Sequence, residues 1–304
     1  MNTHIKYTAL ILFFYFTTVQ AHAQGCSDAG FCTINSVKPS TTDSNAQYKN
    51  DIKIAGFIGG ADHSIGVRGA YLDYSRRLNN KFGFDLRVTT LGQSGNGITT
   101  FGFSDVFVNG NYRIRNNIKL NIGAKLPLND ANKSLNNVGL PMDYQSSLGT
   151  TDLILGLGFS LHSFQIAAAL QQPLTQNKNA FLASNYPESS PISSIQSTRN
   201  FVRSGDALLR VSYPIKLAPK FTCTPGVLSI YHLAEDKYMD EVNEVKTIAG
   251  SDGLTINGTI FFDYKINHKH ALQLNAGMPF VVRKSRPDGL TRGFIANLEY
   301  RFGL

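Results

Sequence analysis

A short polar turn recurs five times in this chain, and each copy follows a strand-like run that carries an aromatic residue. The five copies begin at Tyr74, Tyr112, Phe159, Tyr213 and Tyr264. Tight turns on one side, longer polar loops on the other and an aromatic residue near each tight turn are typical of a transmembrane β-barrel. Strands cross a bilayer only in a sheet that closes on itself, because the hydrocarbon core offers no water to an unpaired backbone group. The repeat therefore predicts an all-β, antiparallel transmembrane barrel.

The first residues have the composition of a secretion signal, so residues 1–23 are predicted to be removed. Lys6 supplies the positive charge, residues 8–19 form an apolar stretch, and Ala21-His22-Ala23 is a cleavage site made of small residues. The alternative is a lipoprotein acylated at Cys26, although the three residues before it match a lipid-attachment sequence poorly. The rest of the chain has no run of about 18 or more apolar residues, so we expect no transmembrane helix.

The chain is mildly basic, with a formal net charge of +8, and its basic residues are interspersed with acidic ones. This distribution suits anionic lipid headgroups or acidic solutes better than nucleic acid. The apolar alternation of the last strand also resembles the signal by which bacterial assembly machinery recognises outer-membrane barrels. We therefore expect outer-membrane lipid, a small-molecule solute and that machinery as partners, in a Gram-negative bacterium, with no nucleic acid, cofactor or metal.

The three cysteines fall into two groups. Cys26 and Cys32 lie six residues apart in a segment delivered to an oxidising compartment, which predicts a small disulfide loop. A metal site at that position would need more ligands than the neighbourhood offers. Cys223 has no evident partner in the sequence, and we expect it to be an apolar residue that faces the membrane.

Alternation of apolar and polar residues predicts about twelve strands, each long enough for a tilted crossing of about 9–11 residues. The predicted strands are residues 52–60, 64–77, 82–91, 100–115, 118–127, 150–161, 164–174, 201–215, 220–233, 254–266, 270–282 and 290–303. The faces of strands 64–77 and 220–233 are ambiguous in phase and are not assigned.

The five tight turns place both ends of the barrel, residues 52–304, on the periplasmic side. The remaining connections are longer and rich in polar residues, which is typical of extracellular loops. The longest are residues 128–149, 175–200 and 234–253. Residues 24–51 precede the barrel and form either a periplasmic tail or a plug inside the lumen.

A second repeat predicts which polar residues face the lumen. Asp105, Asp152, Asp206 and Asn257 each stand seven residues before an aromatic residue of a tight turn. Seven is odd, so a lipid-facing aromatic residue turns the polar one inward. The same alternation turns Arg87 and Lys125 inward on neighbouring strands. These residues form either a polar constriction on a solute path or a salt-bridge network that fills a narrow lumen.

The phase of strand 100–115 adds an apolar feature to the lumen. If Tyr112 faces lipid, then strict alternation turns Phe101, Phe103 and Phe107 inward. Phenylalanines lining a lumen suit an amphipathic or aromatic solute better than an ion. They alternatively pack against the N-terminal segment.

The segments 102–114, 123–130 and 149–160 follow one another in an order that resembles a known family. The resemblance is to the outer-membrane barrels named for the meta-pathway of phenol degradation, which are relatives of the long-chain fatty-acid transporters. It covers roughly residues 100–215 and rests on a glycine–aspartate strand start, a Lys-x-Pro strand end and a later Gly-x-x-Asp strand. The resemblance implies passage of hydrophobic or aromatic compounds across the outer membrane, with an N-terminal segment in the lumen.

The histidines give no arrangement for nucleophilic catalysis. His63 and His162 are each directly followed by a serine, so on a strand the two side chains point to opposite faces. His232 has no serine at the required offset. We therefore expect no enzymatic activity and predict an outer-membrane channel or transporter for small solutes. The alternative is a structural barrel with a closed lumen that binds partners through its loops.

Overall fold

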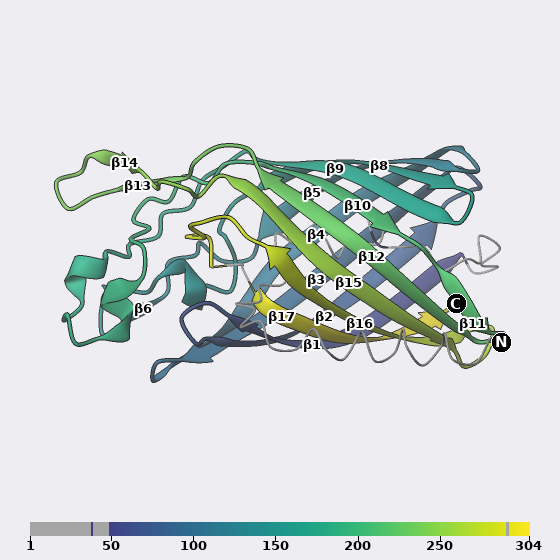
Figure 1. The fold of residues 1–304 in the computed structure, drawn as a ribbon, viewed down its shortest axis with the longest axis horizontal. Coiled ribbons are helices and arrows are strands. Elements are labelled where there is room, and N and C mark those ends of the chain that lie inside the picture. Colours follow the sequence, from purple (N-terminus) through teal and green to yellow (C-terminus); the bar gives the residue numbers. More distant parts are fainter. Residues whose placement is uncertain (1–37, 39–48, 290–291) are drawn as a thin grey trace, which may run out of the picture.

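The computed structural model describes residue 38, residues 49–289 and residues 292–304, and it shows a closed antiparallel β-barrel of 12 strands (Figure 1). The barrel strands run from β1 to β17 in chain order: β1 (Asn50–Ala61), β2 (Gly66–Arg77), β3 (Phe82–Gly95), β4 (Ile98–Arg115), β5 (Ile118–Pro127), β8 (Asp152–Leu161), β9 (Phe164–Pro173), β10 (Asp206–Ser212), β11 (Ile215–Ala218), β12 (Phe221–His232), β15 (Gly253–Lys265), β16 (His270–Val281) and β17 (Arg292–Gly303). Within the described ranges, no helix is long and apolar enough to cross a membrane.

One predicted strand is divided in the structure. Residues 201–215 were expected to be continuous, but β10 begins at Asp206 and β11 starts only at Ile215, and both pair with β12. Tyr213 and Pro214 separate them, because proline has no N–H to donate to the ladder. Together β10 and β11 fill one position of the barrel, and the pairing of β1 with β17 closes it.

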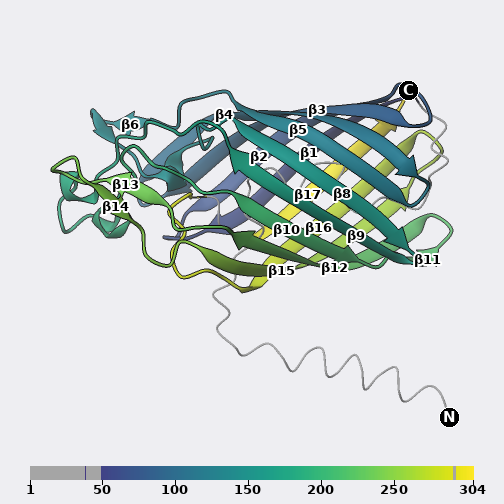
Figure 2. The same cartoon turned by 90° about the horizontal axis from the view of Figure 1, so that it is seen from above.

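The two ends of the barrel differ as the sequence predicts. The tight turns lie at one end, together with Asn50 and Leu304. The backbone N–H of Leu304 donates to the carbonyl of Asn50 at 2.8 Å. We call this end the turn end. The long connections lie at the opposite end, the loop end, where the small strand pairs also project (Figures 1 and 2). These are β6 (Ser134–Leu135) with β7 (Val138–Gly139), and β13 (Lys237–Met239) with β14 (Val245–Thr247).

The outer wall carries the apolar side chains that alternation predicts. On β5, Leu120 and Ile122 are 43% and 56% exposed while Asn121 between them is buried. Aromatic residues gather near the tight turns, where Phe82 and Tyr112 lie 4.7 Å apart between ring centroids. Cys223 lies on this outer face, because its neighbour Thr224 is buried on the inner one.

One loop-end connection is shorter than predicted. Strands β3 and β4 extend toward each other until only Asn96 and Gly97 separate them. Both residues have positive φ, at 51° and 76°, which is the conformation of a two-residue hairpin turn and explains the Asn-Gly sequence. The expectation of a longer polar connection here was wrong.

A β-bulge in β4 overturns part of the predicted lumen lining. Val88 pairs with Val106 but Thr90 pairs with Phe103, so Ser104 and Asp105 together oppose one residue of β3. The extra residue inverts the alternation on the loop-end side of the bulge. Phe101 and Phe103 are consequently 67% and 60% exposed on the outer wall, and only Phe107 points inward. The prediction that all three phenylalanines line the lumen was therefore wrong for Phe101 and Phe103.

The outward position of Ile122 gives a test of membrane insertion. Replacing Ile122 with arginine is expected to lower the free energy of unfolding from lipid vesicles by about 2–4 kcal/mol, the cost of a cation near the bilayer centre. Val242→Arg is the control, because Val242 lies at the tip of the β13–β14 hairpin and is 71% exposed. Equal, small effects of both changes in denaturant titrations would contradict the assignment of this face to lipid.

Candidate functional site

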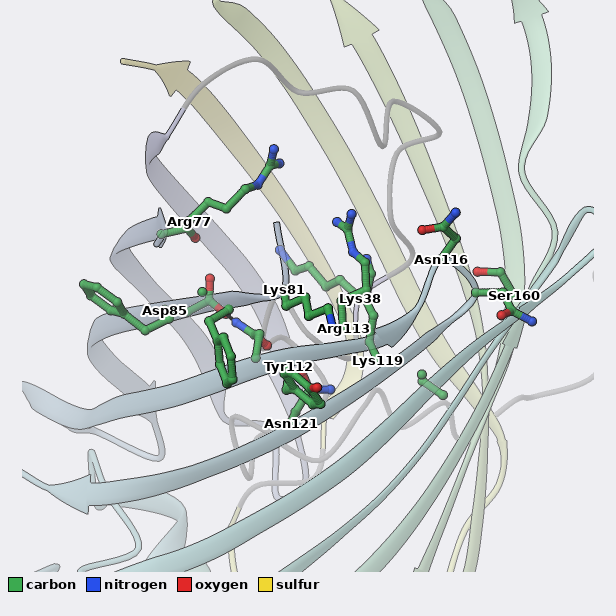
Figure 3. Close-up of a pocket in the computed structure, with 18 of the residues that line it drawn as sticks. Lys38, Arg77, Lys81, Asp85, Tyr112, Arg113, Asn116, Lys119, Asn121 and Ser160 are labelled. Atoms are coloured by element: carbon green, nitrogen blue, oxygen red, sulfur yellow. Dashed lines mark hydrogen bonds between the residues drawn. The ribbon is translucent and has the colours of Figure 1, made fainter. Parts of the chain in front are cut away.

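The lumen contains a cavity at the turn end whose charged lining residues are mostly cationic (Figure 3). Its volume is about 280 Å³, and its lining comes from Lys38, from β1 to β5, from β8 to β10 and from the adjoining turns. The cationic lining residues are Lys38, Lys49, Arg76, Arg77, Lys81, Arg113, Lys119 and Arg210, against the two acids Asp51 and Asp85. An excess of one charge inside a low-dielectric wall concentrates solutes of the opposite charge.

Deeper in the barrel, an ion-pair network begins at Lys38. Its ammonium lies 2.9 Å from Glu299 Oε2 and donates to the Tyr71 hydroxyl at 3.1 Å. Tyr71 in turn donates to Glu299 at 2.6 Å, and the Arg87 guanidinium lies 4.2 Å from the centre of the Tyr71 ring. Arg87 also forms an ion pair with Asp73, in which its Nε and Nη2 both donate to Oδ2, at 3.0 and 2.7 Å. These side chains are all buried, so they form a layer across the lumen.

The position of Lys38 bears on the segment that precedes the barrel. Lys38 is 8% exposed and contacts Tyr71 of β2 and Glu299 of β17, so this residue lies inside the lumen. The other predictions for the N-terminal region concern the signal at 1–23 and the bridge between Cys26 and Cys32. Both lie outside the described residues and remain predictions.

A third layer contains the predicted residues Asp105, Lys125 and Asp152. Lys125 and Asp152 are register partners on β5 and β8, their charged atoms lie 2.8 Å apart, and both side chains are 0% exposed. Lys125 also donates to Thr150 Oγ1 at 3.0 Å, and Gln171 of β9 donates to Asp152. Asp105, in the bulge, accepts from the hydroxyls of Ser104 and Ser147 at 2.9 and 2.6 Å.

The loop end of the lumen holds a network centred on His232. Its Nδ1 lies 2.7 Å from Asp206 Oδ1 and its Nε2 lies 2.8 Å from Asp236 Oδ1. Because both ring nitrogens are engaged and His232 is 1% exposed, the ring is not available to a solute. Arg203, from the connection between β9 and β10, pairs with Asp206. Two barrel strands and two loops thus meet at this histidine.

The connection between β16 and β17 joins the same network. Arg283 pairs with Asp288, donates to the Ser251 carbonyl at 2.7 Å and lies 3.8 Å from Asp236. Arg203 Nε lies 3.8 Å from Asp288. These ion pairs tie three long loops to the barrel wall and to one another.

An apolar layer completes the closure at the loop end. Phe107, Ile154, Leu208, Leu228 and Ile230 point inward from the strands and are buried. They pack against five loop residues, Ala131, Met142, Leu148, Phe201 and Ile248. The lumen is therefore entered from the turn end and is filled by protein at the loop end.

All six polar residues predicted for the lumen are buried on the inner wall. They are Arg87, Asp105, Lys125, Asp152, Asp206 and Asn257, with exposures of 0 to 4%. Each bonds to a near neighbour rather than facing an opposite charge across open space; Asn257, for example, donates to the Leu228 carbonyl at 3.4 Å. In the structure they belong to the packed part of the lumen, while the cavity lies closer to the turn end.

Several residues of the buried networks could not be predicted from the sequence. Arg203, Asp236, Arg283 and Asp288 lie in connections, where no alternation predicts which way a side chain points. Tyr71 was missed because the phase of its strand was ambiguous. The cationic cavity had a readable signal, since Arg113 and Lys119 occupy inward positions beside a tight turn.

The chain matches no protein-family model and no curated protein. Among solved structures it is similar to the NanC porin, with 10% identity over 83% of this chain and 100% of the porin and a TM-score of 0.47. It is also similar to the translocator domain of the autotransporter NalP from Neisseria meningitidis (8% identity, 86% and 90% of the two chains, TM-score 0.48). A third is a Pseudomonas aeruginosa FadL homologue (10% identity, 84% and 74% of the two chains, TM-score 0.41). At these values the similarity transfers no residue's role to this chain.

The pair Lys125–Asp152 predicts a large asymmetry between single and double substitutions. Lys125→Met is expected to lower the free energy of unfolding by about 3–5 kcal/mol, because it leaves a buried carboxylate without its cation. Combining it with Asp152→Asn removes that charge and keeps an acceptor for Gln171, so most of the stability should return. Chemical denaturation of the refolded variants measures both values. A double variant as unstable as Lys125→Met would contradict the assignment.

His63 predicts a pH-dependent contact between a turn and a loop. Its Nδ1 lies 3.3 Å from Asp143 Oδ1, in the loop between β5 and β8, and this hydrogen bond raises the pKa of His63 above its ordinary value. The raised pKa means that the stabilisation is fully present below the unfolded-state pKa of about 6.5 and is lost as pH rises through the folded value.

The test compares the melting temperatures of the wild type and of Asp143→Asn across this pH range. The wild type is expected to be the more stable at low pH, and the difference should shrink as the pH rises. An NMR titration of His63 provides the second measurement. A difference that grows with pH, or an unshifted His63, would refute the contact.

Proposed function

We propose that the protein is an outer-membrane channel for small solutes that is gated at its extracellular end. The observation that carries the proposal is the asymmetry of the lumen. At the turn end, which we assign to the periplasm, a water-accessible cavity enters the barrel. At the loop end, loops fold over the inner wall and occupy the remaining path.

The loop between β5 and β8 is the main candidate for the gate. Met142 and Leu148 from this loop pack among the inward residues of the wall, and Gln145 accepts a bond from Gln93 through its carbonyl. These contacts are side-chain contacts and single hydrogen bonds, whereas the strands are joined by continuous ladders. Displacing the loop therefore leaves the ladders of the barrel intact.

The resemblance to the family of the meta-pathway of phenol degradation supports a finer proposal, that the solute has an aromatic or hydrophobic body. Phe107 is the predicted phenylalanine that remains inside the lumen, where it is 2% exposed and packs in the apolar layer. A displaced loop would uncover this layer to a passing solute. The charged lining of the turn-end cavity adds a requirement on the charge of the solute, which the family resemblance does not imply.

A second candidate function is a closed barrel that binds a partner through its loops. The observation that favours it is the tight packing of the loops at the loop end. Four large side chains there are completely or almost completely buried, namely Arg203, Tyr144, Phe181 and Phe201. The β13–β14 hairpin, which projects from the loop end in Figures 1 and 2, would then be part of the binding surface.

Single-channel conductance in planar lipid bilayers separates the two functions. Replacing residues 131–147 by a short Gly-Ser linker is expected to convert rare or small conductance steps into frequent, larger ohmic steps. The matched control shortens the tip, residues 240–244, of the β13–β14 hairpin that projects from the loop end (Figures 1 and 2). This control is expected to conduct like the wild type. A silent bilayer with folded protein in all cases would overturn the channel and favour the closed barrel.

A further inference from the structure

The wall of the turn-end cavity contains a recess flanked by cations. Register pairing places five inward residues side by side across five strands. In order around the wall they are Arg113, Lys119, Gly158, Ala167 and Arg210. The two small residues lie between Lys119 and Arg210, and all five residues line the cavity. The pattern is therefore cation, small floor, cation.

The floor of this recess is wide and not filled by side chains. Three strand spacings separate Lys119 from Arg210, which corresponds to about 14 Å between their backbones. At Gly158, an added Cβ would lie 3.8 Å or more from every neighbouring atom. Packing of the barrel therefore does not require a glycine at position 158. Because glycine has no side chain, it leaves room for a solute there.

Two cations of the recess, Arg113 and Lys119, lie side by side and repel each other. Arg113 and Lys119 are direct register partners, an arrangement that destabilises a sheet (Figure 3). Arg77 lines the same cavity. Asp85 accepts a bond from Asn111 at 2.6 Å, and Asp51, the other acid of the cavity, pairs with Arg301. A bound anion would relieve this repulsion.

Polar groups border the recess on the side of the tight turns. Ser160, Gln165 and Ser212 are register partners on β8, β9 and β10, and all three line the cavity. Ser212 is 2% exposed, and its hydroxyl has no hydrogen-bond partner among the residues described. A hydroxyl donor next to a lysine and an arginine is a suitable set of groups for a carboxylate.

We propose that this recess binds a small organic anion through its carboxylate, with Lys119 and Arg210 on either side and the organic body over Gly158 and Ala167. The inference names the solute class of the channel and rests on the proposed function for its physiological meaning. The binding itself does not depend on an open gate, because the cavity is reached from the turn end. Its volume of about 280 Å³ matches a small solute.

Isothermal titration calorimetry of the detergent-solubilised wild type, with sodium benzoate at low ionic strength, tests the proposal. Benzoate is expected to give saturable binding that weakens with added salt, while benzyl alcohol and benzylammonium give none. Gly158→Val, which fills the floor, and Lys119→Gln, which removes one cation, should each weaken benzoate binding at least about tenfold. Gly110→Val is the matched control, since an added Cβ there also lies 3.7 Å or more from its neighbours, but on the outer wall.

The outcomes separate this proposal from the channel. Benzoate binding without conductance would support the recess and overturn the channel, and conductance without saturable binding would do the reverse. If inorganic phosphate binds as tightly as benzoate, the recess accepts any oxyanion, and the proposal that it selects an organic anion is overturned. Unchanged affinity in the Lys119→Gln and Gly158→Val variants would overturn the location. Because Lys119→Gln relieves a repulsion, it is expected to fold even if Gly158→Val does not.

Discussion

The seam between β1 and β17 is the contact on which the rest of the barrel depends. It joins the first and last strands in register from the Asp51–Gly303 pair to the Gly60–Phe294 pair. Without it, two strand edges would expose their backbone groups to hydrocarbon, where no water compensates them. Closure also creates the lumen, and with it the low-dielectric interior in which the ion pairs lie.

Once the lumen exists, its contents follow from the cost of burying charge. Lys125, completely buried, lies beside Asp152, and Arg87 lies beside Asp73, because an unpaired ion in these positions would be strongly unfavourable. Near the turn end the opposite holds, since Arg113 lies beside Lys119 where the wall borders the cavity. The two halves of the lumen thus use charge differently, one for packing and one for a surface in contact with solvent.

The sequence predicted the barrel well because alternation and turn chemistry are local signals. The inward positions of Lys125 and Asp152 and the outward position of Ile122 follow from counting along one strand. The bulge at Ser104–Asp105 could not be predicted in this way, since nothing in those two residues marks an insertion. The sequence-based prediction therefore assigned Phe101 and Phe103 to the wrong face. The packing of the loops over the inner wall could not be predicted either, because long loops reach their partners through tertiary contacts that have no sequence period.

The contact of Lys38 has a consequence for how the molecule is assembled. Lys38 binds Tyr71 on β2 and Glu299 on β17, two residues that belong to opposite ends of the barrel sequence and are separated in the sheet by β1 alone. They become neighbours only when the seam has formed. The pair of contacts made by Lys38 therefore cannot form in an intermediate in which the barrel is open. Formation of both contacts indicates that β17 has paired with β1.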